Sequence, residues 1–183
     1  MSALPSQSRY IIGTEACERF SFYGMKSILM LYMTGHLLTS DNWATSTLHI
    51  FVGMVYLLPL AGAWLADKDW GRYKTILYIS LLYCVGHGVL ATADLFHTIE
   101  ARRYILMAGL FIIALGAGGI KPCVSAFMGD QIPNKSPQLM TKAFNAFYWA
   151  INLGSFFSFL LIPAMEQRYG YSSAFAVPGL FMG

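Results

Sequence analysis

The sequence predicts an all-α integral membrane protein. Hydrophobic residues make up 56% of its 183 residues and charged residues only 11%, which is more apolar surface than a soluble domain of this length needs. Several apolar stretches reach about 20 residues, the length of helix that crosses a hydrocarbon core of ~30 Å. The net charge of +3 comes mostly from loops and buried sites, so it does not indicate nucleic-acid binding.

We expect five complete membrane spans and the start of a sixth. The spans cover about residues 10–34, 46–66, 74–93, 102–128 and 142–163, and the last one begins near Ser172. The loops between them are short, which favours antiparallel neighbours. Because the sequence ends at Gly183, too early for the sixth span to finish, we interpret residues 1–183 as one N-terminal transmembrane bundle of a longer protein.

The first span carries charged side chains inside an apolar run from about Arg9 to Thr34. A charge in hydrocarbon costs several kcal/mol unless it faces a cavity or a partner, so such residues are candidates for function. On a helix at ~100° per residue, the charged and neighbouring aromatic residues fall within an arc of about 140°. We expect this stripe to face an interior and the opposite, apolar arc to face lipid. The stripe consists of Glu15, Glu18, Arg19, Phe22, Tyr23 and Lys26.

The second span carries His49 near one end and Tyr56 seven residues later, so both lie on the same face of the helix. An imidazole that faces the outside titrates in the pH range where external acidity matters. An interfacial histidine without such a role is the alternative interpretation, and it stays open. The other three histidines, His36, His87 and His97, are expected to be incidental.

Basic residues in the loops indicate the orientation, because cytoplasmic loops carry an excess of lysine and arginine. With the N-terminus in the cytoplasm, the inside loops would carry six basic residues and the outside loops three. We therefore predict a cytoplasmic N-terminus. The inside set is Arg9, Lys68, Arg72, Lys74, Lys135 and Lys142, and the outside set is Arg102, Arg103 and Arg168.

In this orientation, four polar residues from four spans are expected at one depth. Counting at ~1.5 Å per residue places each of them about 15 Å from the cytoplasmic face, near the middle of a ~30 Å core. Binding at this depth is typical of alternating-access carriers, whereas four unrelated hydrogen bonds between helices are the alternative. The four residues are Arg19, Tyr56, Lys121 and Asn152.

The predicted spans contain more positive than negative charge. Glu15 precedes Arg19 by four residues, so these two side chains can pair on the helix. The remaining charged residues in the spans are one acid, Glu18, and two lysines, Lys26 and Lys121, so one lysine has no acid to pair with. An unpaired buried cation is costly. It therefore needs an acid on further helices, an anionic substrate or deprotonation.

The segment Gly62–Thr75 joins the second and third spans. It combines Gly62, which permits close packing, with Asp67 at a helix end and Arg72 after a turn glycine. This pattern resembles the signature loop of the major facilitator superfamily, where the loop locks or releases the cytoplasmic gate. The alternative is a polar turn that merely follows the positive-inside rule.

The segment Gly118-Gly119-Ile120-Lys121-Pro122 lies late in the fourth span. Paired glycines before a proline loosen the backbone hydrogen bonding, which a membrane helix tolerates when its neighbours satisfy the freed groups. We expect a kink here that tips Lys121 into a cavity.

Four segments together resemble the proton-dependent oligopeptide transporters. Each motif alone is weak, but the four occur in family order across nearly the whole chain. The family usually shows paired tyrosines where this chain has Phe22-Tyr23, so one hydroxyl is missing from the stripe. The four segments are Glu15-x-x-Glu18-Arg19-Phe20, the Gly62–Thr75 loop, Gly118-Gly119-Ile120-Lys121-Pro122 and Phe147-Tyr148-x-x-Ile151-Asn152-x-Gly154-Ser155.

The resemblance implies a major facilitator carrier of twelve or more helices, with this chain as its N-terminal six-helix bundle, truncated in the sixth helix. It implies proton-driven import of di- and tripeptides by alternating access. The implied substrate-binding residues are Arg19 and Lys121 for the peptide carboxylate, Asn152 for the backbone or amino end, and Tyr23 and Tyr56 as pocket walls. The implied proton-coupling residues are Glu15, Glu18 and His49, and the implied gating residues are Lys26, Asp67 and Arg72.

The expected partners are short peptides, protons as the coupling ion, the bilayer of the plasma (cell inner) membrane and a C-terminal six-helix half that this sequence does not include. We expect no other cofactor, no metal and no nucleic acid, and the absence of a nucleophile–base set argues against an enzyme. Two alternatives stay open. One is a symporter of nitrate or another anion on the same scaffold, and the other is a peptide sensor that does not transport.

Overall fold

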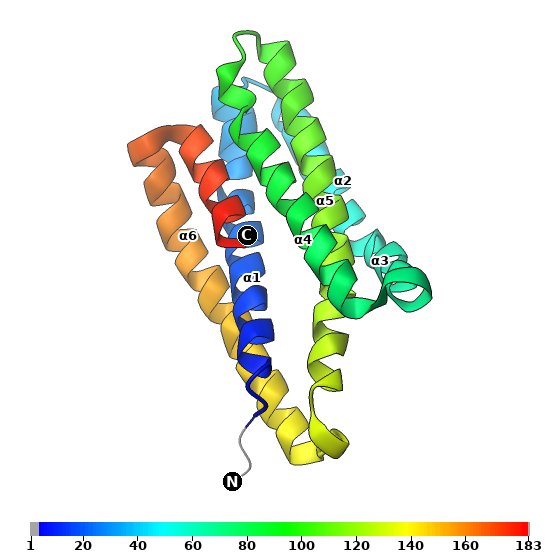
Figure 1. Ribbon diagram of the computed structural model, residues 1–183. Helices are drawn as coiled ribbons and strands as arrows, with labels where there is room; N and C mark the ends of the chain where they lie inside the picture. The colour runs from blue at the N-terminus through cyan, green and yellow to red at the C-terminus, as the bar shows by residue number, and fades with distance from the viewer. Residues whose placement is uncertain (1–3, 183) are drawn as a thin grey trace.

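The computed structural model describes residues 4–182, apart from the side chains of Asp69 and Lys135, as a bundle of helices (Figure 1). It confirms the all-α prediction. The α-helices are α1 Ser8–Leu31, α2 Asp41–Leu57, α3 Pro59–Leu65, α4 Gly71–Ala91, α5 Ile99–Asp130 and α6 Pro137–Met182. Two π-helical segments follow α1 and α3, namely η1 Tyr32–His36 and η2 Ala66–Trp70, and two 3-10 turns precede α5 and α6, namely η3 Ala93–Leu95 and η4 Pro133–Lys135.

The helices form long antiparallel rods (Figure 1). α2 continues into α3 through Leu58, which keeps helical dihedral angles, and Pro59 stands at the start of α3, where its missing N–H is tolerated. α6 folds back on itself at Gly170, whose φ of 80° favours glycine. Its two arms, before and after Gly170, therefore run in opposite directions (Figure 1).

The bundle has a proximal end and a distal end. The proximal end lies near the N-terminus and also contains η4 (Figure 1). The distal end, at the top of Figure 1, contains η1, η3 and the α6 turn at Gly170.

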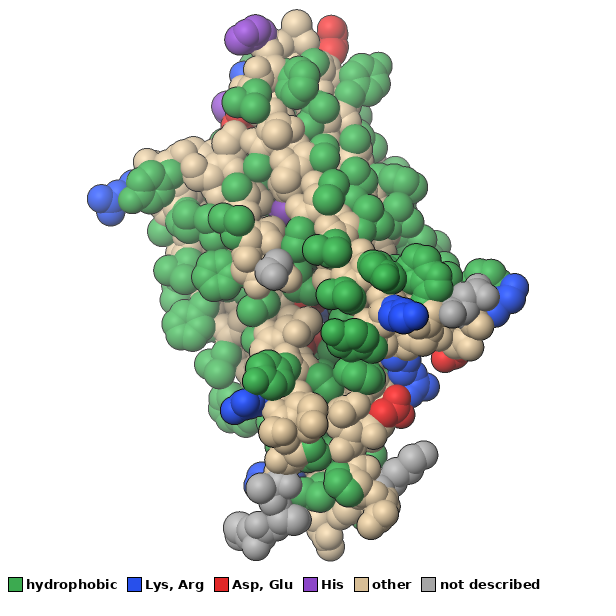
Figure 2. All heavy atoms as spheres, viewed as in Figure 1, with side chains coloured by type: hydrophobic (Ala, Val, Ile, Leu, Met, Phe, Trp, Pro, Cys, Tyr) green, Lys and Arg blue, Asp and Glu red, His purple; other side chains and the backbone are tan. Residues whose placement is uncertain are grey.

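Within residues 4–182, four segments are long and apolar enough to cross a membrane, namely Asp41–Lys68, Gly71–Leu95, Ile99–Asp130 and Pro137–Met182. α1 is not in this set, because its charged residues lower its hydropathy. Figure 2 shows hydrophobic side chains over most of the visible face between the two ends. A patch of this extent is uncommon on soluble proteins. The six-span count and the truncated sixth span stay predictions. The predicted bundle includes residues 1–3 and 183, which lie outside the described residues. The Lys135 side chain, which was counted for the orientation, also lies outside them.

The apolar side of α1 packs against α6. A Cβ on Gly154 would lie 2.4 Å from the carbonyl oxygen of Ala16, and one on Gly24 would lie 2.6 Å from the Ile162 side chain. The Phe20 ring lies 4.8 Å from that of Phe181 in the second arm of α6. The expectation that this side of α1 faces lipid is therefore wrong, because small residues let α6 approach and cover it.

The glycines of α5 also serve close packing. A Cβ on Gly62 of α3 would lie 2.5 Å from the Cα of Gly119, and one on Gly116 would lie 2.6 Å from the Cβ of Tyr83 in α4. α5 continues through Pro122 as one helix from Ile99 to Asp130. The predicted kink at Gly118–Pro122 stays a prediction, and the glycine pair brings three helices together at this part of α5.

We expect Gly154→Ala to lower the stability of the bundle, because the new methyl group would meet backbone atoms of α1 rather than a flexible side chain. Overpacking of this kind costs about 1–3 kcal/mol. The thermal unfolding midpoint of the detergent-solubilised full-length protein measures the loss. Gly53→Ala is the matched control, since a Cβ there meets nothing within 4 Å. Equal midpoints for the two variants would contradict the tight crossing of α1 and α6.

Candidate functional site

Two acids on α1 share one arginine. Nε of Arg19 lies 3.3 Å from Oε1 of Glu15, and the same guanidinium donates a hydrogen bond to Glu18. All three residues are buried, with Glu18 only 1% exposed. The sequence predicted the pair of Glu15 with Arg19 from its four-residue spacing, and it placed Glu18 on the same helix face, where it can compete for Arg19. One guanidinium group thus contacts two buried carboxylates on the same helix.

Two cations from different helices lie close to the ring of Phe22. Its centroid is 5.6 Å from Cζ of Arg19 on α1 and 5.3 Å from Nζ of Lys121 on α5. Lys121 also lies over the ring of Tyr56, at 5.1 Å. Cations are attracted to aromatic faces at such distances. The Phe22 ring is thus a common neighbour of the two positive charges.

Lys121 makes no ion pair with the side chains that the structure describes. It is half-buried at the edge of the Arg19 cluster. The two acids nearest to it are both engaged with Arg19. An ammonium group in this position can bind an anionic group that is not part of the chain.

Two other stripe residues are half-buried. Tyr23 packs edge-on against Phe22, with ring centroids 5.5 Å apart, and Arg19 Cζ lies 5.8 Å from its ring. Lys26 lies about two turns beyond Arg19 toward the distal end. The stripe thus extends from the buried acids to a more open region.

The predicted layer of four polar residues is only partly assembled. Arg19, Lys121 and Tyr56 are linked through the contacts with Phe22 and Tyr56 described above. Asn152 is exposed on α6, and its side-chain amide donates to the carbonyl of Tyr148, one turn earlier, at 2.7 Å. Tyr56 is 72% exposed. Both residues present polar groups on a surface that is otherwise largely apolar, where a second group of helices or lipid would meet them.

The proximal end contains an ion pair that the sequence did not predict. Arg72, at the start of α4, pairs with Asp130 at the end of α5. Asp67, the acid of the signature loop, is exposed in η2 nearby. The position of Asp130 at the proximal end of a neighbouring span was the available signal, because it ends on the same side as Arg72.

Two of the four histidines have surroundings that the sequence did not indicate, whereas the role of His49 stays a prediction. His49 is exposed on α2, and no polar contact of its ring is found among the described side chains. His87 is fully buried on α4, with its ring centroid 4.8 Å from that of Tyr83. His36, expected to be incidental, contacts both Asp94 and Arg102 at the distal end. Tertiary packing gives these two histidines surroundings that their sequence neighbours do not indicate.

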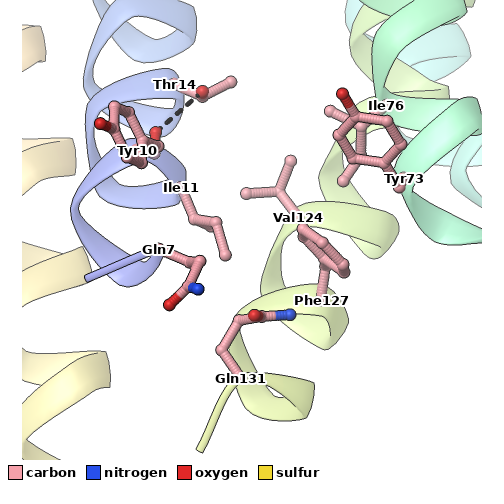
Figure 3. A pocket seen from close by; sticks show the side chains of 9 residues that line it. All are labelled: Gln7, Tyr10, Ile11, Thr14, Tyr73, Ile76, Val124, Phe127 and Gln131. Carbon is pink, nitrogen blue, oxygen red and sulfur yellow. Dashed lines mark hydrogen bonds between the residues drawn. The ribbon is translucent and has the colours of Figure 1, made fainter. Parts of the chain in front are cut away.

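A separate cavity of about 380 Å³ lies between α1, α4 and α5 toward the proximal end (Figure 3). No charged side chain lines it. Figure 3 shows Tyr10 and Thr14 on one wall, with the Thr14 hydroxyl donating to the Tyr10 carbonyl, and Tyr73 across from them on α4. This cavity is therefore distinct from the charged site. Its lining is Gln7, Tyr10, Ile11, Thr14, Tyr73, Ile76, Val124, Phe127 and Gln131.

Comparison with known proteins identifies the family. The family model described as PTR2, the POT family, matches residues 73–183. The chain belongs to the POT family. The resemblance seen in the four motifs is thereby confirmed, and the chain is that of a multi-pass membrane protein from a transporter family.

Curated relatives of this POT-family chain match almost all of it. Human solute carrier family 15 member 2 is 41% identical over 189 aligned residues, which cover 99% of the chain. Peptide transporter family 1 of Drosophila melanogaster is 43% identical over 187 aligned residues, which cover 97% of the chain. The match covers only 26% of the human protein and 25% of the fly protein. The chain therefore spans about a quarter of the length of these relatives.

Solved structures of POT-family transporters have the same arrangement of helices. The crystal structure of PepTSo superposes with a TM-score of 0.89 at 46% identity, and the match covers 99% of this chain and 36% of that one. A POT-family transporter in complex with a thioalcohol-conjugated peptide superposes with a TM-score of 0.87 at 26% identity, with 97% of this chain and 36% of that chain covered.

Proposed function

We propose that this protein is a proton-coupled symporter that imports di- and tripeptides by alternating access. In this proposal the chain supplies the N-terminal wall of the binding pocket, and a further six-helix half supplies the other. The observation that carries the proposal is the pair of cations, Arg19 and Lys121, around Phe22 and beside two buried acids. The names of the curated relatives and the peptide-bound structural relative support peptide as the substrate.

Arg19 and Lys121 are proposed to bind the carboxylate of the peptide. A guanidinium offers a planar fork of donors that matches a carboxylate, whereas an ammonium acts as a point charge. Lys121 is not engaged in an ion pair with a described side chain, and Arg19 can release one acid and still keep the other. A carboxylate between the two cations would relieve their mutual repulsion. Tyr23 and Tyr56 would line the space beside it, and Asn152 would meet the peptide backbone or amino end.

Glu15 and Glu18 are proposed to couple the peptide to the proton. Both carboxylates compete for the single guanidinium of Arg19. When one of them takes up a proton it loses its charge and holds Arg19 less strongly, which frees a donor for the peptide carboxylate. His49 is proposed to respond to protons from the outside, since its exposed imidazole lies on the same helix as Tyr56.

The ends of the bundle are proposed to act as gates. Rocking of one helix bundle against another around a central site is the usual mechanism of such carriers. The Arg72–Asp130 pair, together with Asp67, would hold the proximal gate on the cytoplasmic side, and Lys26 would serve the outer gate. This assignment places the N-terminus in the cytoplasm and the protein in the plasma (cell inner) membrane.

A symporter of nitrate or another small anion is the second candidate. Two cations close to one aromatic ring can hold any anion of suitable size. A peptide sensor that binds without transporting would use the same site. The names of the curated relatives and the peptide-bound structural relative favour a peptide symporter over these alternatives.

Uptake by the full-length protein in liposomes tests the proposal. We expect labelled dipeptide to accumulate at an external pH of about 5.5 and much less at about 7.5, with the interior held at the higher pH, because the inward proton gradient drives the carrier. Unlabelled dipeptide should compete, whereas excess nitrate should not. Competition by nitrate together with nitrate accumulation would establish the anion carrier, and peptide binding without accumulation would establish the sensor.

A further inference from the structure

The distal end contains a cluster of polar and aromatic side chains from four segments. Figure 2 shows histidine, acidic and basic side chains gathered at the top of the molecule. The hydroxyl of Tyr32 donates to Oδ1 of Asp94 at 3.1 Å, and Nε2 of His36 lies 3.0 Å from the same oxygen. Nη1 of Arg102 lies 3.0 Å from that same histidine nitrogen. The distal cluster consists of Tyr32, His36, Asp94, Arg102 and Tyr171.

The two contacts of His36 are chemically incompatible. Nε2 has either a hydrogen or a lone pair, but not both. With a lone pair it accepts a hydrogen bond from Arg102, while Asp94 faces it with a second lone pair. With a hydrogen it donates to Asp94, while Arg102 faces it with another hydrogen. The two contacts at this nitrogen therefore exclude one another.

The surrounding side chains hold both partners within reach of His36. Its ring stacks on Tyr32, with centroids 5.3 Å apart, and lies 5.1 Å from the ring of Tyr171 on α6. Nε of Arg102 donates to the carbonyl of Phe96 at 2.7 Å, independently of His36. Glu166, beside Tyr171, is the further charged residue on this side of α6. An exchange of partners therefore needs only a small movement.

We propose that His36 is a proton-responsive positioning residue that exchanges Arg102 for Asp94 when it takes up a proton and thereby ties the distal end of α1 more firmly to the α4–α5 connection. The protonated ring makes a charge-assisted hydrogen bond to Asp94, which is about twice as strong as a neutral one. It is also repelled by Arg102, which retains its bond to Phe96.

The exchange of partners matters for α1 because the distal cluster connects that helix to the other half of the bundle. Along its length α1 packs mainly on α6 and touches α5 only slightly. Its distal end is fixed through η1, in which the amides of Leu37 and Thr39 donate to the carbonyls of Tyr32 and Met33 at 2.9 and 3.0 Å. The same helix carries Arg19. The consequence for transport rests on the proposed function, whereas the exchange of partners does not.

Hydrogen exchange in the full-length protein tests the exchange of partners without requiring transport. The reporters are the amides of Leu37 and Thr39, compared at about pH 5.5 and about pH 7.5 after correction for intrinsic rates. We expect their protection to be about fivefold higher in acid, because a charge-assisted bond replaces a neutral one. His36→Gln, which keeps hydrogen-bonding groups but cannot titrate, should remove this difference. His97→Gln, at an exposed loop position, should keep it.

Two further variants separate the partners. Asp94→Asn should abolish the acid-induced protection, since the imidazolium loses its acceptor charge. Arg102→Gln should keep it, since it removes the partner of the neutral ring and the Arg102–Asp94 ion pair at 3.9 Å but leaves the Asp94 carboxylate in place to accept from the imidazolium. Equal protection of the wild-type protein at both pH values, or a pH difference that survives in His36→Gln, would overturn the proposal. A protein that shows the predicted exchange but accumulates no peptide would refute the proposed function and leave the His36 assignment standing.

Discussion

Arg19→Lys is expected to reduce dipeptide uptake by roughly 10- to 150-fold. A lysine keeps the positive charge but removes the planar fork that can bind a carboxylate with two parallel bonds. The loss of one hydrogen bond to a charged group costs about 1.5–3 kcal/mol, which converts to that range of affinity. Initial rates of labelled dipeptide uptake by the full-length protein in liposomes measure the effect. A lysine at position 19 would also bind Glu15 and Glu18 less well, since one ammonium group replaces the several directed donors of the guanidinium.

Arg168→Lys provides the matched control, because Arg168 is exposed near the α6 turn and far along the chain from the charged site. It should transport at the wild-type rate. The amount of each variant in the liposomes has to be equal for the comparison. Wild-type uptake by Arg19→Lys would show that the guanidinium does not make the decisive contact.

Glu15→Gln and Glu18→Gln are each expected to abolish accumulation of peptide against a gradient. Glutamine fills nearly the same volume and can still accept a bond from Arg19, so the helices should stay assembled. It carries no exchangeable charge, so it cannot alternate between holding and releasing Arg19 as protons arrive. Exchange of labelled for unlabelled peptide, which needs no proton gradient, should continue. Gradient-driven accumulation and exchange, measured in the same liposomes, distinguish coupling from binding.

Glu100→Gln is the control for these variants, because Glu100 is an exposed acid in the first turn of α5. It should retain both accumulation and exchange. The assignment is wrong if accumulation driven by the proton gradient survives in both the Glu15 and the Glu18 variants.

Much of the charged stripe could be predicted from periodicity alone. The helical spacing of Glu15, Arg19 and Phe22 fixes their common face whatever surrounds the helix. Burial of the acids with Arg19 follows, because unpaired charges are costly in an apolar environment. The four-residue spacing also predicted the pair of Glu15 with Arg19. These inferences depend on one helix, so no knowledge of the other helices is needed.

Contacts between helices could not be predicted in the same way. The contact of both Arg19 and Lys121 with the ring of Phe22 depends on how α1 and α5 cross, and spacing within a helix carries no information on that crossing. The packing of α6 over the apolar side of α1 could not be predicted for the same reason. Small residues such as Gly154 indicate a close approach but not its partner.

The distal cluster was missed for a related reason. His36 follows the last residues of a predicted span, where a loop histidine has no periodic neighbour. Its partners come from η3 and α5, which are close in space and distant in sequence. The π-helical turn η1 is what directs Tyr32 and His36 toward Asp94, and such turns leave a weak signal in a sequence.

Binding of a dipeptide and of its C-terminal amide to the full-length protein tests the central claim most directly, because the two ligands differ only in the carboxylate that Arg19 and Lys121 are proposed to hold. The wild-type protein should bind the free acid at least about tenfold more tightly than the amide, as expected for a hydrogen bond to a charged group. Lys121→Gln should weaken binding of the acid and leave binding of the amide nearly unchanged, so that the preference largely disappears. An undiminished preference in Lys121→Gln, or an equal loss of both ligands, would contradict the account.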